Sequence, residues 1–246
     1  MKRIRKLLPQ TTAARHTVRQ HPLVYQWHAE PGRRSLPMRR VEPSRPLPTP
    51  TMMGLSQVPF DFTGHMTRLC QHIIEHTPDL KHIDLSRVLV TITRAKTRRH
   101  TGLQAKVTPM RFKHGQLTQK RRSWVYQVQQ YYVNNVEMLY LLSFCLPRFQ
   151  DLPYEEKLIT IFHELFHISP EFNGDLRRHE GRYYQHSHSK KKYDAHMQGY
   201  VEKYLQVHHD ASLTGFLRSS FEELHERHGS VHGVMVPVPK LVPLLG

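Results

Sequence analysis

The sequence predicts an α+β domain over residues 59–246, preceded by a disordered basic tail over residues 1–58. The tail is rich in proline, arginine, glutamine and threonine, and such a composition cannot bury enough apolar surface to offset its ordering entropy. From Phe60 onward, some segments repeat apolar residues at helical spacing, and short β-branched runs stand between them. We therefore expect a small mixed sheet packed with helices.

Positive charge is concentrated in the tail. The chain of 246 residues has 36 Lys and Arg against 20 acids, a formal net charge of +16, and residues 1–58 hold eleven of the basic residues but two of the acids. Such an excess attracts polyanions, so the tail is a candidate nucleic-acid arm. Its aromatic residues for base stacking are sparse, Tyr25 and Trp27, which slightly favours a solvated tail without a partner.

Cysteine content and hydropathy indicate where the protein resides. Cys70 and Cys145 are the two cysteines of the chain, so a disulfide framework and a zinc site built on cysteine pairs are excluded. Leu7 and Leu8 are followed at once by Pro9, which argues against a signal peptide. The sequence has no apolar stretch long enough to span a membrane. We expect a cytoplasmic protein with no membrane partner.

The first half of the domain predicts one helix followed by strands. Residues 61–76 carry apolar side chains at helical spacing and end at Thr77-Pro78. Residues 87–93 are β-branched and read as a strand, and residues 103–107 and 124–130 predict further short strands. The apolar run 137–146, stopped by Pro147, fits a strand or a helix, and we interpret it as a strand.

The second half predicts mainly helices. Residues 153–168 form the clearest one, with Pro153 near its start and Glu155 and Glu156 in the first turn, where the helix dipole favours acids. Two further helices are expected at about 189–207 and 212–228. The apolar, proline-containing end, residues 234–245, could add an edge strand.

The helix at 153–168 contains the sequence HELFH over residues 163–167. Residues four apart lie on one face of a helix, so His163 and His167 can direct their rings at one metal ion. Glu164 lies beside the first histidine, where it can accept a proton from a water that the metal activates. Zinc with three protein ligands lowers the pKa of such a water to about 7. The motif therefore predicts a catalytic Zn²⁺ site with Glu164 as general base.

The context of the motif strengthens the prediction. The chain contains 20 histidines, so roughly 0.1 accidental matches are expected, about tenfold more than for an average composition. The helix also has a broad apolar face, on which ionisable residues are costly unless they pair or bind a metal. The competing interpretation is that His163 and His167 are surface residues on a polar stripe.

A second arrangement of histidines competes with this motif. The sequence HIIEH over residues 72–76 matches the inverted zinc motif. The helix that carries it is shorter and more polar, and nothing obvious downstream completes a site. Surface histidines on an amphipathic helix are the favoured interpretation there.

A catalytic zinc needs a third ligand. A histidine six residues after His167 would indicate a metzincin, but Asn173 occupies that position. The downstream candidates are His179, His186, His188, Asp194 and His196, of which we favour His186, then His188, then His179. Donors for the developing oxyanion are expected among the tyrosines and arginines nearby, which are Tyr183, Tyr184, Arg177 and Arg178. The loop 174–178 is equally well interpreted as structural, with Arg–Asp pairing fixing it.

Several segments resemble the phage-type metallopeptidase family of bacteria and their viruses. They are LPRF at 146–149, KLIT at 157–160, HELFHISP at 163–170 and FNGDLRR at 172–178. The resemblance runs from about Asp61 to the C-terminus and leaves the basic tail outside. It implies a compact zincin-like fold and a zinc-dependent peptidase, with His163, Glu164 and His167 carried over directly. The stretch HSHS at 186–189 looks like the family's His-containing segment and supports a third ligand there.

Our leading hypothesis from the sequence is thus a zinc metallopeptidase that acts on a protein or peptide. The alternative is a nucleic-acid-binding protein whose zinc site is structural or vestigial, which the basic tail and basic body favour. A protease recruited to nucleic acid by its tail would combine the two.

Overall fold

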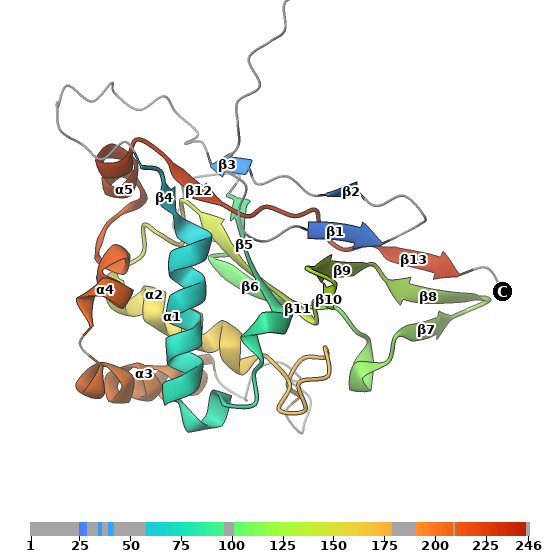
Figure 1. Cartoon of the computed structure of the whole chain (residues 1–246). Coiled ribbons are helices and arrows are strands. Elements are labelled where there is room, and N and C mark those ends of the chain that lie inside the picture. The colour runs from blue at the N-terminus through green and yellow to red at the C-terminus, as the bar shows by residue number, and fades with distance from the viewer. Residues whose placement is uncertain are drawn as a thin grey trace, which may run out of the picture.

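The computed structural model describes residues 58–95, 101–178, 190–208 and 210–244, with only the backbone given over 190–195. It also describes the backbone of three short strands before residue 42. The described helices and strands form an α+β structure in which helices gather on one side of the molecule and a long β-ribbon projects from the other (Figure 1).

A three-stranded mixed sheet lies at the centre. Its order is β5 (Val88–Arg94), β11 (Tyr140–Leu146) and β6 (Ala105–Pro109), with β11 parallel to β5 and antiparallel to β6. All seven residues of β11 are buried, as expected for a central strand covered on both faces. This confirms the interpretation of the apolar run before Pro147 as a strand, and β6 is left as an edge strand.

Helices α1 (Phe62–His76) and α2 (Tyr154–Phe166) cover the same face of this sheet. Alternate β11 residues, Tyr140, Leu142 and Phe144, share one hydrophobic core with the buried faces of both helices. The intervening residue Leu141 belongs to a smaller apolar cluster on the opposite face. Both predicted helices are confirmed, and α1 begins at Asp61, whose carboxylate accepts a hydrogen bond of 3.0 Å from the Gly64 N–H.

Helix α3 (Lys190–Val207) packs on α2, as the sequence predicted for the segment 189–207. The contact is largely aromatic. Tyr200 lies 4.6 Å, between ring centroids, from Phe166, and Tyr204 lies 5.8 Å from Phe162. The motif helix α2 is therefore held between the sheet and α3.

The single helix predicted over 212–228 is wrong. The chain instead forms α4 (Ala211–Thr214), a 3₁₀ turn and α5 (Phe221–His228). The break occurs because Ser220 starts a new helix: its hydroxyl accepts from the Glu223 N–H at 3.2 Å, and the Glu223 carboxylate accepts from the Ser220 N–H at 2.7 Å. This reciprocal capping box competes with continuation of the preceding helix.

The remaining strands form three small sheets. The projecting ribbon of Figure 1 contains β7 (Thr118–Arg121), β8 (Trp124–Val128) and β13 (Leu241–Leu244) in the order β13-β8-β7, which confirms the predicted C-terminal edge strand. The other strands are β9 (Gln130–Val133), β10 (Val136–Glu137), β4 (Phe60–Asp61) and β12 (Val231–Gly233).

Three strands come from the segment that the sequence assigns to the tail, β1 (Tyr25–His28), β2 (Arg34–Ser35) and β3 (Arg39–Val41). The backbone of β1 pairs with β2 and β9, and that of β3 pairs with β12. The other residues before 58 lie outside the described part of the chain, so the tail boundary at residue 58 stays a prediction. In the described part of the chain, every helix is too short or too polar to cross a membrane.

Candidate metal centre

His163 and His167 stand at the C-terminal end of α2. His163 lies in the last turn and His167 caps the helix, with its N–H bonded to the carbonyl oxygens of His163 and Glu164. Their rings are adjacent, with centroids 4.6 Å apart and planes inclined at 79°. Both side chains are partly exposed. The helix therefore places the two imidazoles side by side on its surface.

Glu164, next to His163 in the helix, faces the interior and is 8% exposed. Its Oε2 accepts a hydrogen bond of 2.7 Å from the backbone N–H of Val107 in the edge strand β6. Burial raises the pKa of this carboxyl to about 7, although the hydrogen bond from Val107 acts in the opposite direction. A carboxyl with a pKa near neutrality can both accept and return a proton.

The donor set fits a zinc ion. Neutral imidazoles are preferred zinc ligands, and the two rings lie on one helix face with a carboxylate next to them in sequence. The favoured third ligand, His186, and the alternatives His188 and His179 lie outside the described residues. Tyr183 and Tyr184, the predicted oxyanion donors, lie in the same segment, so all five stay predictions.

The loop that follows α2 folds back on the helix end. Ile168 forms a β-bridge with Leu176, and the Arg177 N–H donates to the His167 carbonyl at 2.7 Å. The Arg177 guanidinium lies 5.3 Å from the centre of the Phe166 ring. Together these contacts hold His167 and its two neighbours, Phe166 and Ile168, in place.

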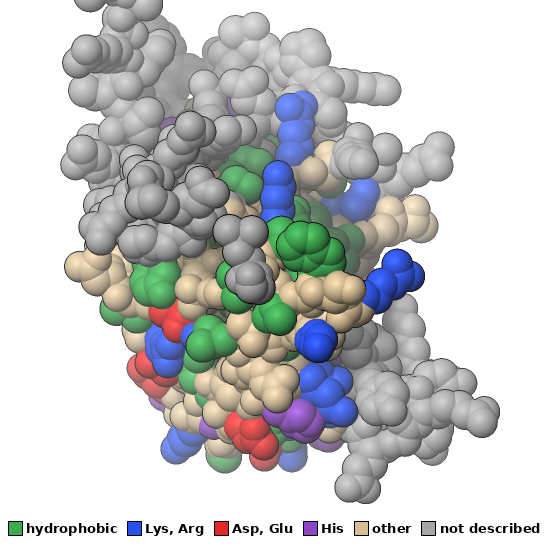
Figure 2. All heavy atoms as spheres, turned by 90° about the vertical axis from the view of Figure 1, so that its right-hand side faces the viewer, with side chains coloured by type: hydrophobic (Ala, Val, Ile, Leu, Met, Phe, Trp, Pro, Cys, Tyr) green, Lys and Arg blue, Asp and Glu red, His purple; other side chains and the backbone are tan. Residues whose placement is uncertain are grey.

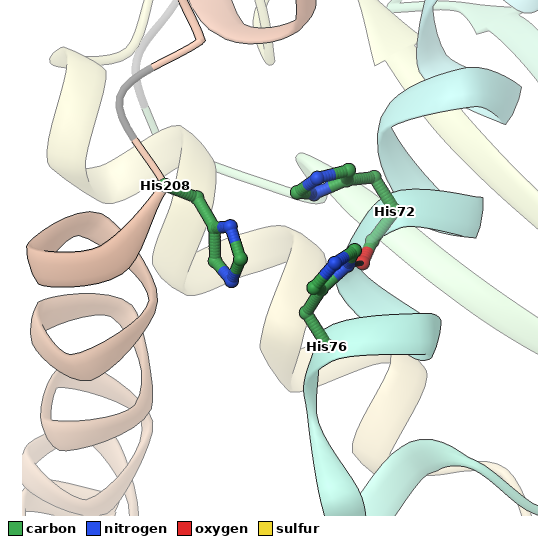
Figure 3. Close-up of side chains that lie close together, drawn as sticks. All are labelled: His72, His76 and His208. Atoms are coloured by element: carbon green, nitrogen blue, oxygen red, sulfur yellow. Dashed lines mark hydrogen bonds between the residues drawn. The ribbon is translucent and has the colours of Figure 1, made fainter.

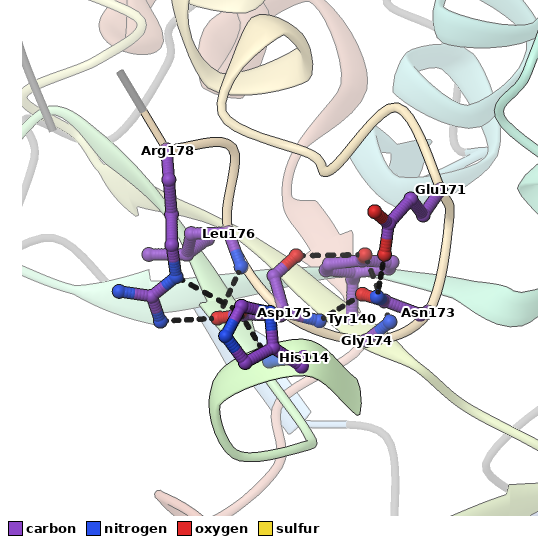
Figure 4. A network of polar contacts seen from close by, with 8 residues as sticks. All are labelled: His114, Tyr140, Glu171, Asn173, Gly174, Asp175, Leu176 and Arg178. Carbon is purple, nitrogen blue, oxygen red and sulfur yellow. Dashed lines mark hydrogen bonds and ion pairs between the residues drawn. The ribbon is translucent and has the colours of Figure 1, made fainter. Parts of the chain in front are cut away.

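Asp175 is the hub of this loop (Figure 4). Its buried carboxylate accepts from the N–H groups of His114 at 2.9 Å and Leu176 at 2.8 Å, and it forms a bidentate pair with the Arg178 guanidinium at 2.9 and 3.0 Å. Burial raises the pKa of Asp175, but these donors outweigh it and hold the pKa below its ordinary value. The pairing supports the structural interpretation of the loop, and an oxyanion role for Arg178 stays a prediction.

Tyr140 anchors the same loop to the central sheet. Its hydroxyl donates to the Asp175 carbonyl at 2.8 Å and accepts from the Gly174 N–H at 2.9 Å (Figure 4). Gly174 has a φ of +87°, a conformation that favours glycine, and a Cβ there would collide with Arg111. Sequence reasoning missed Tyr140, because its place in an apolar run gives no sign of a polar contact made 35 residues later.

A basic hollow of about 430 Å³ borders this loop. It runs from the end of β6 to β7 and the loop after α2. Its lining includes five cationic side chains and one acid, namely Arg111, Lys113, Arg121, Arg177, Arg178 and Asp175. One lining residue, Arg177, contacts the end of the motif helix, because its backbone N–H donates to the His167 carbonyl.

The expectation that nothing downstream completes a site at the competing HIIEH sequence is not met, because a third histidine lies beside its two. Glu75 is exposed and its carboxylate accepts from the Gln71 side chain. His72 and His76 instead lie close to His208 at the end of α3, which sequence reasoning missed because 132 residues separate it from His76. Burial, followed by the neighbouring His76 and His208, lowers the pKa of His72.

The sequence matches the model of one protein family. The family model described as "Putative phage metallopeptidase" matches residues 65–209. The chain belongs to this metallopeptidase family. Searches of curated proteins and of solved structures find no match.

Membership in the metallopeptidase family confirms the resemblance that the sequence suggested. The matched region runs from α1 to the end of α3 and contains the whole HELFH helix. It ends at residue 209, short of the C-terminus that the resemblance was expected to reach, so α4, α5 and β13 lie outside it. Membership in this family supports a role for the chain as a hydrolase that uses a metal and acts on protein.

Proposed function

We propose that the chain is a zinc-dependent peptidase of zincin-like fold, with its active site at the HELFH helix. The observation that carries the proposal is the division of the motif between two environments: His163 and His167 present adjacent rings at the surface, while Glu164 is buried against β6. If the motif were only a polar stripe on the helix surface, it would not need a buried carboxylate, because removing a carboxylate from water costs free energy. The family match supports the same function.

His163, His167 and a third histidine, His186 in the favoured case, would hold the zinc. When bound, the ion supplies a water of lowered pKa and a Lewis acid for the scissile carbonyl. Glu164 would accept the proton of the attacking water and return it to the leaving amine. Its raised pKa suits both steps, and its bond to Val107 would hold the carboxylate ready beside the first histidine.

The edge strand β6 and the basic hollow indicate the form of the substrate. The Val107 N–H donates to Glu164 and not to β11, so the outer edge of β6 faces the site. An extended peptide can add to such an edge as a further strand. The hollow at the end of β6 has an excess of positive charge, which favours peptides with acidic side chains.

Glu164→Gln tests the function directly. The full-length, zinc-loaded variant should retain its zinc and lose peptide hydrolysis by about 10²-fold or more, because a general base contributes on the order of 10²–10⁴. Glu155→Gln is the matched control, since Glu155 is an exposed carboxylate in the first turn of the same helix. Equal hydrolysis by the Glu164→Gln variant and the wild type would contradict the proposal.

Nucleic-acid binding is the second candidate function, and one surface favours it. A hollow of about 530 Å³ at the β7–β8 turn is lined by Arg121, Arg122, Trp124 and Tyr126. Trp124 is 51% exposed, and aromatic side chains beside cations are typical of single-strand binding. In Figure 2, which views this end of the molecule, Lys and Arg side chains lie beside exposed hydrophobic ones.

The two candidate functions predict different effects of mutations at this surface. Salt-sensitive binding of a single-stranded oligonucleotide, weakened in the full chain by Arg122→Gln and Trp124→Ala, would support the second function. The same variants should leave peptide hydrolysis unchanged if the β7–β8 turn serves only nucleic acid. Binding that both variants retain at wild-type strength would remove this surface as the interface.

A further inference from the structure

Three histidines meet where α1 and α3 end. His72 and His76 lie one turn apart at the C-terminal end of α1, and His208 directly follows α3. Figure 3 shows the three rings turned toward one another across the gap between the helices. One nitrogen of each ring lies within 4.8 Å of the others. Within the described ranges, this is the one group of three His, Cys, Asp or Glu side chains placed to hold a metal ion.

We propose that His72, His76 and His208 form a second metal site, separate from the HELFH helix, that takes Zn²⁺ or a similar divalent transition metal. Three imidazoles suit Zn²⁺, Ni²⁺ or Cu²⁺, whereas Mg²⁺ and Ca²⁺ prefer oxygen ligands. The two sites share no residue. One carboxylate oxygen of nearby Glu75 accepts a hydrogen bond from the Gln71 side chain, and we assign the second site a structural role.

The hydrogen bonds of His72 and His76 each use Nδ1, which leaves Nε2 of these two rings to face a metal ion. His76 Nδ1 lies 2.8 Å from the backbone carbonyl of His72. A carbonyl only accepts, so Nδ1 carries the proton and Nε2 keeps its lone pair. His72 Nδ1 lies 2.7 Å from the Tyr204 hydroxyl, which can accept its proton in the same way. Outer contacts of this kind fix the tautomer and orientation of metal-binding histidines.

The spacing of the rings is compatible with closure on an ion. Ring centroids are 4.0 Å apart for His72 and His76, 4.3 Å for His76 and His208, and 4.8 Å for His72 and His208. A tetrahedral ion with bonds of about 2.1 Å holds its nitrogens about 3.4 Å apart. The ligand nitrogens lie within 4.8 Å of one another, so each pair must close by at most roughly 1.4 Å. The rings must turn so that their nitrogens converge, which rotation about the broad χ2 torsion of histidine allows. His76 is exposed and has room to move.

A bound ion would fasten the end of α3 to α1. Helix α3 packs its buried Met197, Val201 and Tyr204 into the core against α2, which carries the HELFH motif. Tyr204 takes part in both the core contact and the hydrogen bond to His72. The second ion would thereby stabilise the packing of the motif helix without touching its histidines. This role does not depend on whether the HELFH site is catalytic.

The test uses full-length protein without a histidine tag, stripped of metal with a chelator. His163→Gln/His167→Gln removes the first site and serves as the parent. Titration with Zn²⁺ by calorimetry, and with Co²⁺ by absorbance, then reports binding to the second site. We expect the parent to bind about one Zn²⁺ at this site and to gain thermal stability from it.

Single substitutions in the parent identify the ligands. His76→Gln and His208→Gln should each weaken this binding more than about tenfold, and Tyr204→Phe, which keeps the buried ring, by about tenfold. His225→Gln on α5 is the control and should bind zinc as the parent does. Circular dichroism establishes that each variant folds.

Two results would overturn the second site. One is a parent that binds no zinc, and the other is unchanged zinc binding in both His76→Gln and His208→Gln. A failure of the second site can be distinguished from a failure of the proposed function. If the HELFH helix bound no metal, the wild type and the parent would take up equal zinc, and the loss caused by His76→Gln would still be seen.

Discussion

The backbone N–H of Val107 donates a hydrogen bond of 2.7 Å to the carboxylate of Glu164, and this bond joins the edge strand β6 to the motif helix α2. The contact spans 57 residues of sequence. It places the predicted general base at the boundary between the helix and the strand along which a substrate would lie. The N–H of Val107 is buried with its partner, so the bond serves the fold as well as the site.

Substitutions of Glu164 should separate the contribution of this hydrogen bond to the fold from its contribution to the site. Glu164→Ala leaves the Val107 N–H buried without a partner and should lower the free energy of unfolding by about 1–3 kcal/mol. Glu164→Gln keeps an acceptor oxygen and should stay within about 1 kcal/mol of the wild type. Urea unfolding measures both, with exposed Glu155→Ala as the control. Equal stability of the Ala and Gln variants would show that the bond contributes nothing to the fold.

Loss of the Tyr140 hydroxyl should loosen the loop after α2. Tyr140→Phe removes the hydrogen bonds to the Asp175 carbonyl and the Gly174 N–H, and we expect a loss of about 1–3 kcal/mol in the free energy of unfolding. Zinc affinity at the HELFH site should fall as well, because this loop fixes the backbone of His167. Tyr126→Phe on the projecting strand β8 is the matched control. A variant with wild-type stability would contradict the anchoring role.

Two glycines should respond to alanine with opposite signs. Gly174→Ala forces a side chain into a left-handed conformation and against Arg111, so it should destabilise the protein by about 1–3 kcal/mol. Gly199 lies within α3 with nothing within 4 Å of a built Cβ, so Gly199→Ala should stabilise it by about 0.5–1 kcal/mol. Thermal unfolding of the two variants checks the sign directly. If both variants changed the stability in the same direction, the backbone conformation described for Gly174 or for Gly199 would be contradicted.

Acid should destabilise the fold through His65. Burial lowers the pKa of His65 below 6.5, with the hydrogen bond to the Asp61 carbonyl acting in the opposite direction. The unfolded chain then binds more protons than the folded chain, so stability falls as the pH drops below about 6.5. His65→Asn keeps an N–H donor without the charge and should reduce the difference in unfolding free energy between pH 7.5 and pH 5.5. An unchanged difference would exclude His65 as its source.

The basic hollow predicts a preference among substrates. Lys113→Gln and Arg121→Gln replace two exposed cations of its lining. We expect the double variant to raise KM for acidic peptides by several-fold to about tenfold, with little change for neutral peptides. The effect should shrink at high salt, because exposed charges are screened. Parallel changes for both peptide classes would indicate a general loss of activity instead.

Local patterns in the sequence predicted much of this structure. The helix around HELFH, the strand before Pro147 and the C-terminal edge strand follow from periodicity, capping and breaker residues that lie within each segment. The same kind of signal marked the break before α5, since Ser220 and Glu223 have capping-box spacing, but the apolar periodicity of 212–228 concealed it.

Contacts between distant segments could not be predicted from one sequence. The bond from Val107 to Glu164 and the approach of His208 to His72 both depend on how the helices and sheet pack. The sequence around His208, at the end of a polar helix, does not indicate which residues lie near it in the fold. The third ligand of the HELFH site depends in the same way on the segment 179–189, for which the sequence offers three histidines and no geometry.

Zinc content of the His167→Ala variant tests the central claim most directly. Full-length wild type and variant, purified in parallel without a tag and with limiting added zinc, are analysed for zinc per chain. We predict that His167→Ala loses about one zinc ion per chain relative to the wild type and retains no peptide hydrolysis, while the zinc that depends on His76 remains. Zinc content equal to that of the wild type would contradict a metal centre at the HELFH helix.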